Sequence, residues 1–127
     1  MLTLSFLASA MVAIVLHELS HVFMASALGV KVKRVGLSWR GPYVVRESGT
    51  PVQNIAISLA GPAANLLTVA ACLYAGRGLD LCVASLVLGA FNLLPIPSSD
   101  GVRAARLLWI MATTTSFEKT GVALARP

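Results

Sequence analysis

The stretch His17-Glu18-Leu19-Ser20-His21 lies inside a long apolar run, and it decides how the rest of the chain is interpreted. It has the pattern H-E-x-x-H. On a helix, His17 and His21 lie one turn apart on the same face, so their imidazoles can converge on one metal ion. Glu18 flanks that position and can act as a base toward water. The chain has only two histidines, and because both fall here the sequence predicts a zinc site.

The composition predicts an integral membrane protein. Hydrophobic residues make up 57% of the 127 residues, charged residues only 12%, and the mean hydropathy is +0.81. Such a chain is too apolar for an ordinary soluble domain and is short enough to form one domain. Histidines and a carboxylate inside an apolar span are costly unless something coordinates or solvates them. The pentad and the composition therefore support each other.

The net charge of +5 could indicate nucleic-acid binding, but the placement of the basic residues argues against it. Lysines and arginines cluster at the ends of apolar runs, where they orient a protein in a membrane and contact anionic lipid. We therefore expect a lipid bilayer as a partner and no nucleic acid. The first apolar run has no lysine or arginine before it and continues into the pentad, so we interpret it as a retained helix rather than a signal peptide.

The hydropathy pattern predicts an all-α membrane protein with three transmembrane helices and a small β-hairpin. The expected elements are a helix over 1–29, a β-hairpin loop over 30–54, helices over 55–76 and 79–94, and a short interfacial or partly embedded helix over 100–115.

Within the hairpin, a shift of the apolar phase predicts a bulge near Gly36, and Arg40-Gly41-Pro42 predicts the turn before a second strand, Tyr43 to Arg46. Pro62 should kink or loosen the second helix beside a small-residue face of Ala60, Gly61 and Ala64.

The distribution of positive charge predicts the orientation in the membrane. The loop after the first helix and the stretch after the third are basic, whereas the turn between the second and third helices has only Arg77, offset by Asp80. The positive-inside rule then places the N-terminus outside and the C-terminus in the cytoplasm. We expect a multi-pass protein of a bacterial or archaeal cell membrane.

A catalytic zinc usually takes three protein ligands, so the pentad leaves one to be found. His17 and His21 lie in the inner half of the first helix, roughly 12 to 18 Å from its inner end at about 1.5 Å per residue. Asp80 belongs to the opposite face of the membrane, as do Cys72 and Cys82, which also lack zinc-finger or redox spacing.

Of the remaining carboxylates, Glu47 falls in the surface hairpin and Glu118 in the polar tail. Either would need a long re-entrant segment to reach the histidines. Asp100 follows the third span after a short irregular stretch on the inner side, so it can point back into the bundle at the right depth. Depth alone therefore favours Asp100 as the third ligand, although capping of the fourth helix is the alternative role for this residue.

Three motifs in this order resemble the site-2 protease family of intramembrane zinc metalloproteases. They are the pentad at 17–21, Gly61-Pro62-Ala63-Ala64-Asn65, and Asn92-Leu93-Leu94-Pro95 running to Asp100-Gly101. Together they span residues from about 10 to 110, and the combination is far more specific than H-E-x-x-H alone. One position departs from the family pattern, since Ser99 stands where leucine is common.

The resemblance implies a core of three catalytic helices, a zinc ion within the membrane, and hydrolysis of peptide bonds in transmembrane substrates. His17, His21 and Asp100 match the zinc ligands, and Glu18 matches the catalytic glutamate. Asn92 matches an asparagine that contacts substrate or the developing oxyanion.

Two further points stay open at the level of sequence. Asn65 matches the asparagine of the second motif, where helix packing and shaping of the active site are both possible roles. A membrane metal-binding or transport protein without hydrolytic activity is the alternative function. A transporter would place its ligands along a path through the bilayer, whereas here the polar groups gather at one depth.

Overall fold

The computed structural model describes residues 4–38 and 41–124, with side chains at 4–37 and 43–114. The chain is mostly helical, as the sequence predicts, with one β-hairpin between the first two helices. Its elements are α1 (Leu4–Ala27), β1 (Val32–Ser38), β2 (Gly41–Arg46), α2 (Pro51–Ala75), α3 (Leu79–Leu93) and α4 (Asp100–Leu124).

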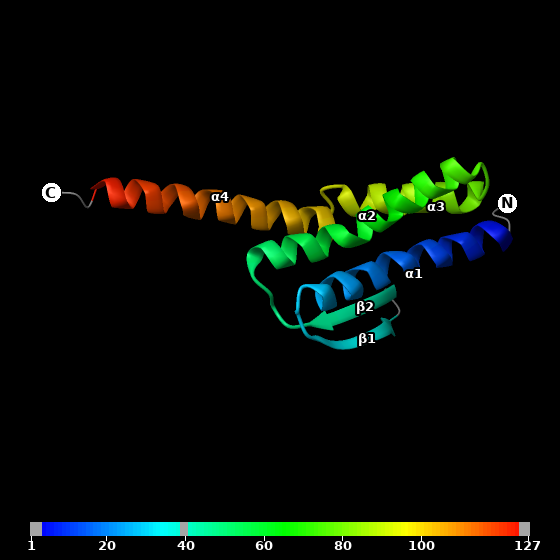
Figure 1. Ribbon diagram of the computed structural model, residues 1–127, viewed down its shortest axis with the longest axis horizontal. Helices are drawn as coiled ribbons and strands as arrows, with labels where there is room; N and C mark the ends of the chain where they lie inside the picture. The colour runs from blue at the N-terminus through cyan, green and yellow to red at the C-terminus, as the bar shows by residue number, and fades with distance from the viewer. Residues whose placement is uncertain (1–3, 39–40, 125–127) are drawn as a thin grey trace.

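Helix α2 lies at the centre of the arrangement (Figure 1). It runs antiparallel to α1, contacts α3 and the start of α4, and is therefore covered on several sides. Helix α3 returns alongside α2 and also contacts α1. Close approach is possible because Gly89 of α3 has no side chain: a Cβ placed on it would lie 3.2 Å from the Cβ of Asn65 on α2.

The start of α2 differs from the prediction, because the helix begins at Pro51 and not near residue 55. Thr50 and Gln53 form a capping box: the Thr50 hydroxyl accepts the Gln53 backbone N–H, and the Gln53 side chain accepts the Thr50 backbone N–H. Pro51 suits the first helical turn. Residues 51–54, which the sequence predicts as part of the hairpin loop, are therefore the N-terminal turn of the helix. The helix ends at Gly76, whose φ of 61° is left-handed.

The hairpin packs beside α1, and its two strands pair antiparallel (Figure 1). The β-bulge lies between Val32 and Arg34, not near Gly36 as predicted. The apolar phase changes after Val32, and Lys33 is the extra residue that produces the change. Gly36 instead faces the ring of Tyr43, which leaves no room for a Cβ. In the predicted turn, Arg40 lies outside the described residues, and β2 begins at Gly41.

Helix α4 continues to Leu124 and projects beyond the other helices, whereas the sequence predicted an end near 115 (Figure 1). The Thr113 and Thr114 hydroxyls donate to backbone carbonyls one turn earlier, so these polar side chains are satisfied within the helix and do not end it.

In the described part of the chain, two helices, α1 and α2, are long and apolar enough to cross a membrane. Helix α3 is apolar but has only 15 residues.

Candidate metal centre

The two histidines of the pentad lie on the face of α1 that packs against α2. His17 is 3% exposed and His21 is largely buried. Beneath them α2 carries Gly61, where a Cβ would lie 2.5 to 2.6 Å from ring atoms of both histidines. The rings therefore occupy space that any other residue at position 61 would fill.

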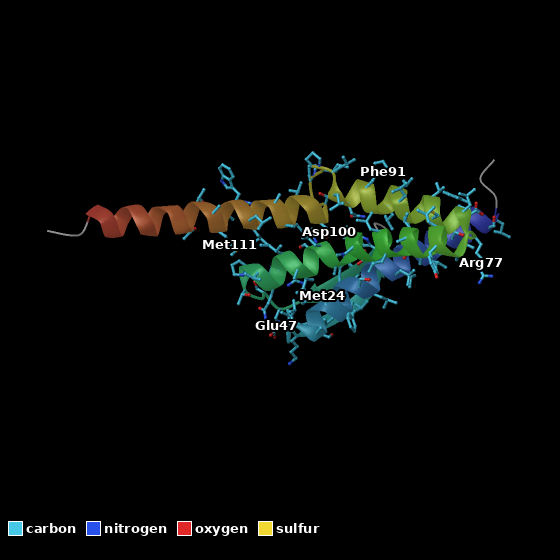
Figure 2. All side chains as sticks on the ribbon, turned by 45° about the horizontal axis from the view of Figure 1, so that its top comes forward. Met24, Glu47, Arg77, Phe91, Asp100 and Met111 are labelled. Atoms are coloured by element: carbon cyan, nitrogen blue, oxygen red, sulfur yellow. The ribbon has the colours of Figure 1, made fainter. Side chains whose placement is uncertain are left out.

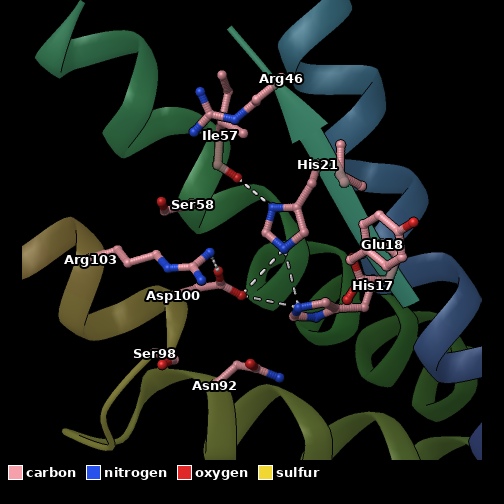
Figure 3. Close-up of a pocket in the computed structure, with 12 residues that line it drawn as sticks. His17, Glu18, His21, Arg46, Ile57, Ser58, Asn92, Ser98, Asp100 and Arg103 are labelled. Atoms are coloured by element: carbon pink, nitrogen blue, oxygen red, sulfur yellow. Dashed lines mark hydrogen bonds and ion pairs between the residues drawn. The ribbon is translucent and has the colours of Figure 1, made fainter. Parts of the chain in front are cut away.

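Asp100 meets the two histidines from about 80 residues further along the chain (Figure 3). The carboxylate Oδ2 lies 3.1 Å from His17 Nε2 and 3.3 Å from His21 Nε2, and the two Nε2 atoms are 3.2 Å apart. Three atoms that can each donate a lone pair thus form a nearly equilateral triangle.

The triangle has the size of one face of a zinc coordination tetrahedron. Ligand atoms about 2.0 to 2.1 Å from a tetrahedral ion lie roughly 3.3 Å from one another. His17, His21 and Asp100 are the group of described residues that could hold a metal ion, and two imidazoles with one carboxylate are a ligand set suited to zinc. Three protein ligands leave the fourth position of the tetrahedron open.

The turn between α3 and α4 holds Asp100 in place. The Ser99 hydroxyl accepts the backbone N–H of Val102 and donates to the Leu94 carbonyl, so Ser99 caps α4 and fixes it to the end of α3. Ser98 has a φ of 76°. At Gly101 a Cβ would lie 2.6 Å from the Leu93 carbonyl oxygen, so only glycine allows this close approach.

The Asp100 side chain therefore does not cap α4, which was the alternative role for this residue. Ser99 is the cap, and the Asp100 carboxylate points to the histidines. Burial raises the pKa of Asp100, but its hydrogen bonds with His17 and His21 outweigh that effect and hold the pKa well below its usual range. Its second oxygen lies 3.8 Å from the guanidinium of Arg103.

A polar cavity of about 260 Å³ opens beside the triangle (Figure 3). Glu18 and Asn92 both line it, so the structure brings all five residues singled out in the sequence to one place. The Asn92 Nδ2 group donates to the Leu88 carbonyl, which uses one of its two hydrogens. The cavity is also lined by Tyr43, Val44, Arg46, Ile57, Ser58, Ser98 and Arg103.

Two of these lining residues are not predicted from the sequence to belong to a site, since Arg46 is expected at the end of the second strand and Arg103 on the fourth helix, both within basic stretches. Burial and the neighbouring positive charge of Arg103 lower the pKa of Arg46. Arg46 donates to the Asn54 side-chain oxygen at 2.6 Å, which holds it at the edge of the cavity.

The carboxylates rejected on grounds of depth lie elsewhere. Asp80 accepts a hydrogen bond from Ser5 near the start of α1. Glu47 forms an exposed ion pair with Lys33 at 3.6 Å. Figure 2 shows how far apart these regions are, since Glu47 and Arg77, which lies close to Asp80 in the chain, mark opposite ends of the helical core. The side chain of Glu118 lies outside the described part of α4.

The sequence missed the contacts that α2 makes to the histidines. His21 Nδ1 lies 2.6 Å from the Ile57 carbonyl oxygen, and His17 Nδ1 lies 3.1 Å from the Asn65 amide. With Gly61 between them, these positions follow a four-residue spacing along one face of α2. That spacing was visible in the sequence, but a backbone carbonyl has no sequence signal.

Three comparisons relate the chain to known proteins. It is 30% identical to a Synechocystis sp. protein provisionally named a zinc metalloprotease, over 89% of this chain and 33% of the relative. It is 29% identical to a zinc metalloprotease of Methanocaldococcus jannaschii, over 76% of this chain and 32% of the relative. The structure matches the site-2 protease from Methanocaldococcus jannaschii with a TM-score of 0.69 and 27% identity, covering 83% of this chain and 54% of that one.

These matches, taken with the geometry of the site, define the class of protein: the chain belongs to the site-2 protease family. No protein-family model matches the sequence. The chain spans about a third of the length of the curated relatives it matches.

Proposed function

We propose that this chain is an intramembrane zinc metalloprotease that hydrolyses peptide bonds of transmembrane substrates. The observation that carries the proposal is the triangle of His17, His21 and Asp100 ligand atoms, with Glu18 beside it. The relatives' names point to the same chemistry. A ligand triangle alone would also suit a metal-binding protein, whereas a neighbouring carboxylate outside the ligand set is the arrangement that hydrolysis needs.

The zinc, when bound by His17, His21 and Asp100, would activate a water molecule and polarise the scissile carbonyl. Glu18 takes a proton from the attacking water and passes it to the leaving amine. Asn92 has a second Nδ2 hydrogen beyond the one given to Leu88, and it donates this hydrogen to the oxygen on which negative charge develops.

Substrate must arrive unwound, because a helix hides its carbonyls in its own hydrogen bonds. Strand β2 pairs with β1 along one edge, and Tyr43, Val44 and Arg46 of β2 line the cavity. The hairpin is therefore placed to guide an extended substrate by strand pairing, which would bring a peptide bond alongside the site.

In this proposal α1, α2 and α3 form the transmembrane core of a single intramembrane metalloprotease unit covering residues 1–127. Helix α3 is about 22 Å long at 1.5 Å per residue, shorter than the roughly 30 Å hydrocarbon layer. The irregular segment 94–99 would complete the crossing, and non-helical chain at that depth has to line a cavity or be covered by protein. Ser98 lines the cavity, whereas Leu94 and Ile96 are exposed and would need a covering partner. The N-terminus is outside and the C-terminus is cytoplasmic, in keeping with the basic loops.

The test measures zinc content and cleavage in purified, detergent-solubilised protein. We expect about one zinc per wild-type chain and a sharp loss in Asp100→Ala. Glu18→Gln should keep its zinc and lose cleavage of single-span peptides by about 10²- to 10⁴-fold. Glu47→Gln is the matched control, because Glu47 lies in the hairpin, away from the site, and should change neither quantity.

The outcomes separate the two candidate functions. Cleavage retained in Glu18→Gln would refute the assigned base. Zinc bound tightly by a wild-type chain that cleaves no member of a broad panel would favour the metal-binding or transport alternative.

A further inference from the structure

Three residues on one face of α2 lie against the two histidines of α1. Ile57, Gly61 and Asn65 follow one another at four-residue spacing, which keeps them on one stripe of the helix. Because α1 and α2 run antiparallel, His21 meets Ile57, His17 meets Asn65, and Gly61 lies under both rings.

At His21 the position of the ring proton follows from the partner. A backbone carbonyl can only accept a hydrogen bond, so at 2.6 Å from the Ile57 oxygen the Nδ1 atom of His21 carries the proton. The lone pair of a neutral His21 is then on Nε2, the atom that belongs to the ligand triangle. Pro62 has no N–H to give the Ser58 carbonyl, so the helix ladder is loosened next to the carbonyl that serves His21.

The partner of His17 is the side-chain amide of Asn65, which can either donate or accept a hydrogen bond. The amide of Asn65 is fully buried, its Nδ2 end lies 3.1 Å from His17 Nδ1, and its Oδ1 has no hydrogen-bond partner within the described part of the chain. The nitrogen and oxygen ends of an amide are interchangeable in shape, and their assignment depends on the hydrogen-bond network. Either end can therefore face the histidine.

The ligand triangle decides between these two orientations. If an amide N–H faced Nδ1, a neutral His17 would carry its proton on Nε2, pointing into the triangle and blocking coordination. If the oxygen faces Nδ1, the proton is on Nδ1 and the Nε2 lone pair is available. A hydrogen bond at the other ring nitrogen is also how metal-binding histidines are usually oriented.

We infer that Asn65 is a positioning residue whose amide oxygen accepts the Nδ1–H of His17 and so directs the His17 Nε2 lone pair to the metal. The inference rests on the metal centre proposed above. Ile57 and Asn65 then give both histidines the same tautomer from one helix that supplies no ligand. Gly89 of α3 approaches the Asn65 Cβ closely, which keeps the amide against the histidine.

The test is zinc affinity, measured by competition with a chelator of known strength. Asn65→Leu keeps a similar volume but cannot accept a hydrogen bond, and it should weaken zinc binding about 10- to 100-fold. Asn65→Asp keeps an acceptor oxygen and should stay within a few-fold of the wild type. Thr68→Val is the control on the same helix, since the Thr68 hydroxyl donates to the Ala64 carbonyl of its own helix, and the zinc affinity of this variant should not change.

Two results would overturn the role of Asn65: wild-type affinity in Asn65→Leu, or equal weakening in Asn65→Leu and Asn65→Asp, which is the behaviour of a residue needed only for packing. Failure of the wild-type chain itself to bind zinc would instead refute the proposed metal centre. These failures are therefore distinguishable.

A second measurement needs no variant at Asn65. The chain has only two histidines, so nitrogen-15 labelling of histidine gives two ring systems in the NMR spectrum of the zinc-loaded protein. We expect both rings protonated at Nδ1 and metal-bound through Nε2. A His17 ring bound through Nδ1, or protonated at Nε2, would overturn the inference.

Discussion

Helices α1 and α2 are almost equal in length and similarly apolar, yet they are packed differently. In the most apolar stretch of α2, 33% of the residues are buried, against 11% in α1. The difference arises because α2 is covered by α1, α3 and the start of α4, whereas one face of α1 remains open (Figure 1).

The two helices also contribute differently to the site. Helix α1 supplies two of the proposed ligands and the proposed base, all from one pentad, while its other face exposes large apolar side chains such as Leu7, Met11 and Val15. Helix α2 supplies a carbonyl, a glycine and a buried amide. Hydropathy alone does not distinguish a helix that supplies metal ligands and a base from a helix that orients those side chains.

Loss of a ligand from α1 should have the largest effect. His21→Ala removes one corner of the triangle, so zinc affinity should fall by more than the roughly 100-fold limit expected for residues that only orient ligands. Leu16→Ala, on the same helix but about a third exposed, should leave the affinity unchanged. Chelator competition on the two variants measures the contrast, and similar affinities would place the metal elsewhere.

Removal of the metal should loosen α1 from its partners. A ligand present at about 100 times its Kd stabilises a folded protein by roughly 2.7 kcal/mol. A chelator should therefore lower the Tm of the wild type in detergent far more than that of His21→Ala, which binds zinc much more weakly. An equal decrease in both proteins would show a non-specific effect of the chelator.

Truncation of an apolar side chain should cost more on α2 than on α1. Ile57 is 2% exposed and packs in the core with Ala25 and Val30, so Ile57→Ala should destabilise by about 2 kcal/mol through the cavity it leaves. Leu7 is half exposed on the open face of α1, and Leu7→Ala should stay within about 0.5 kcal/mol. Unfolding in mixed micelles compares the two, and equal losses would contradict the central place of α2.

Gly61→Ala should reduce zinc affinity less than the loss of a ligand does. The added methyl would lie 2.5 to 2.6 Å from both imidazoles, so the rings must shift or α1 must move away. Overpacking of this kind costs roughly 1 to 3 kcal/mol. We expect about a tenfold loss of zinc affinity, whereas Gly76→Ala, at the far end of α2, should leave zinc affinity unchanged.

The sequence predicts those parts of the site that depend on local spacing. His17 and His21 follow from helical periodicity, and Asp100 follows from the depth at which each carboxylate can lie. The role of Ile57 could not be predicted, because a carbonyl looks the same at every residue and its use depends on how α1 and α2 are aligned.

The same limit applies to the fold. The helices and hairpin follow from apolar periodicity, but the bulge at Lys33 and the start of α2 at Pro51 depend on pairing and capping contacts that a hydropathy pattern does not contain. The sequence also leaves the role of Asn65 open between helix packing and shaping of the site. Its contact with His17 depends on how α1 and α2 are aligned, which the sequence does not show.

The distance along the chain between His17 and Asp100 has a consequence for biogenesis. During synthesis the histidines emerge long before the aspartate, and two histidines alone do not complete the triangle. Contacts between residues so far apart in sequence form late, after the intervening segments have packed. The proposed metal centre can therefore be completed only after α3 has brought Asp100 back beside α1, so a half-inserted chain would lack the proposed hydrolytic activity.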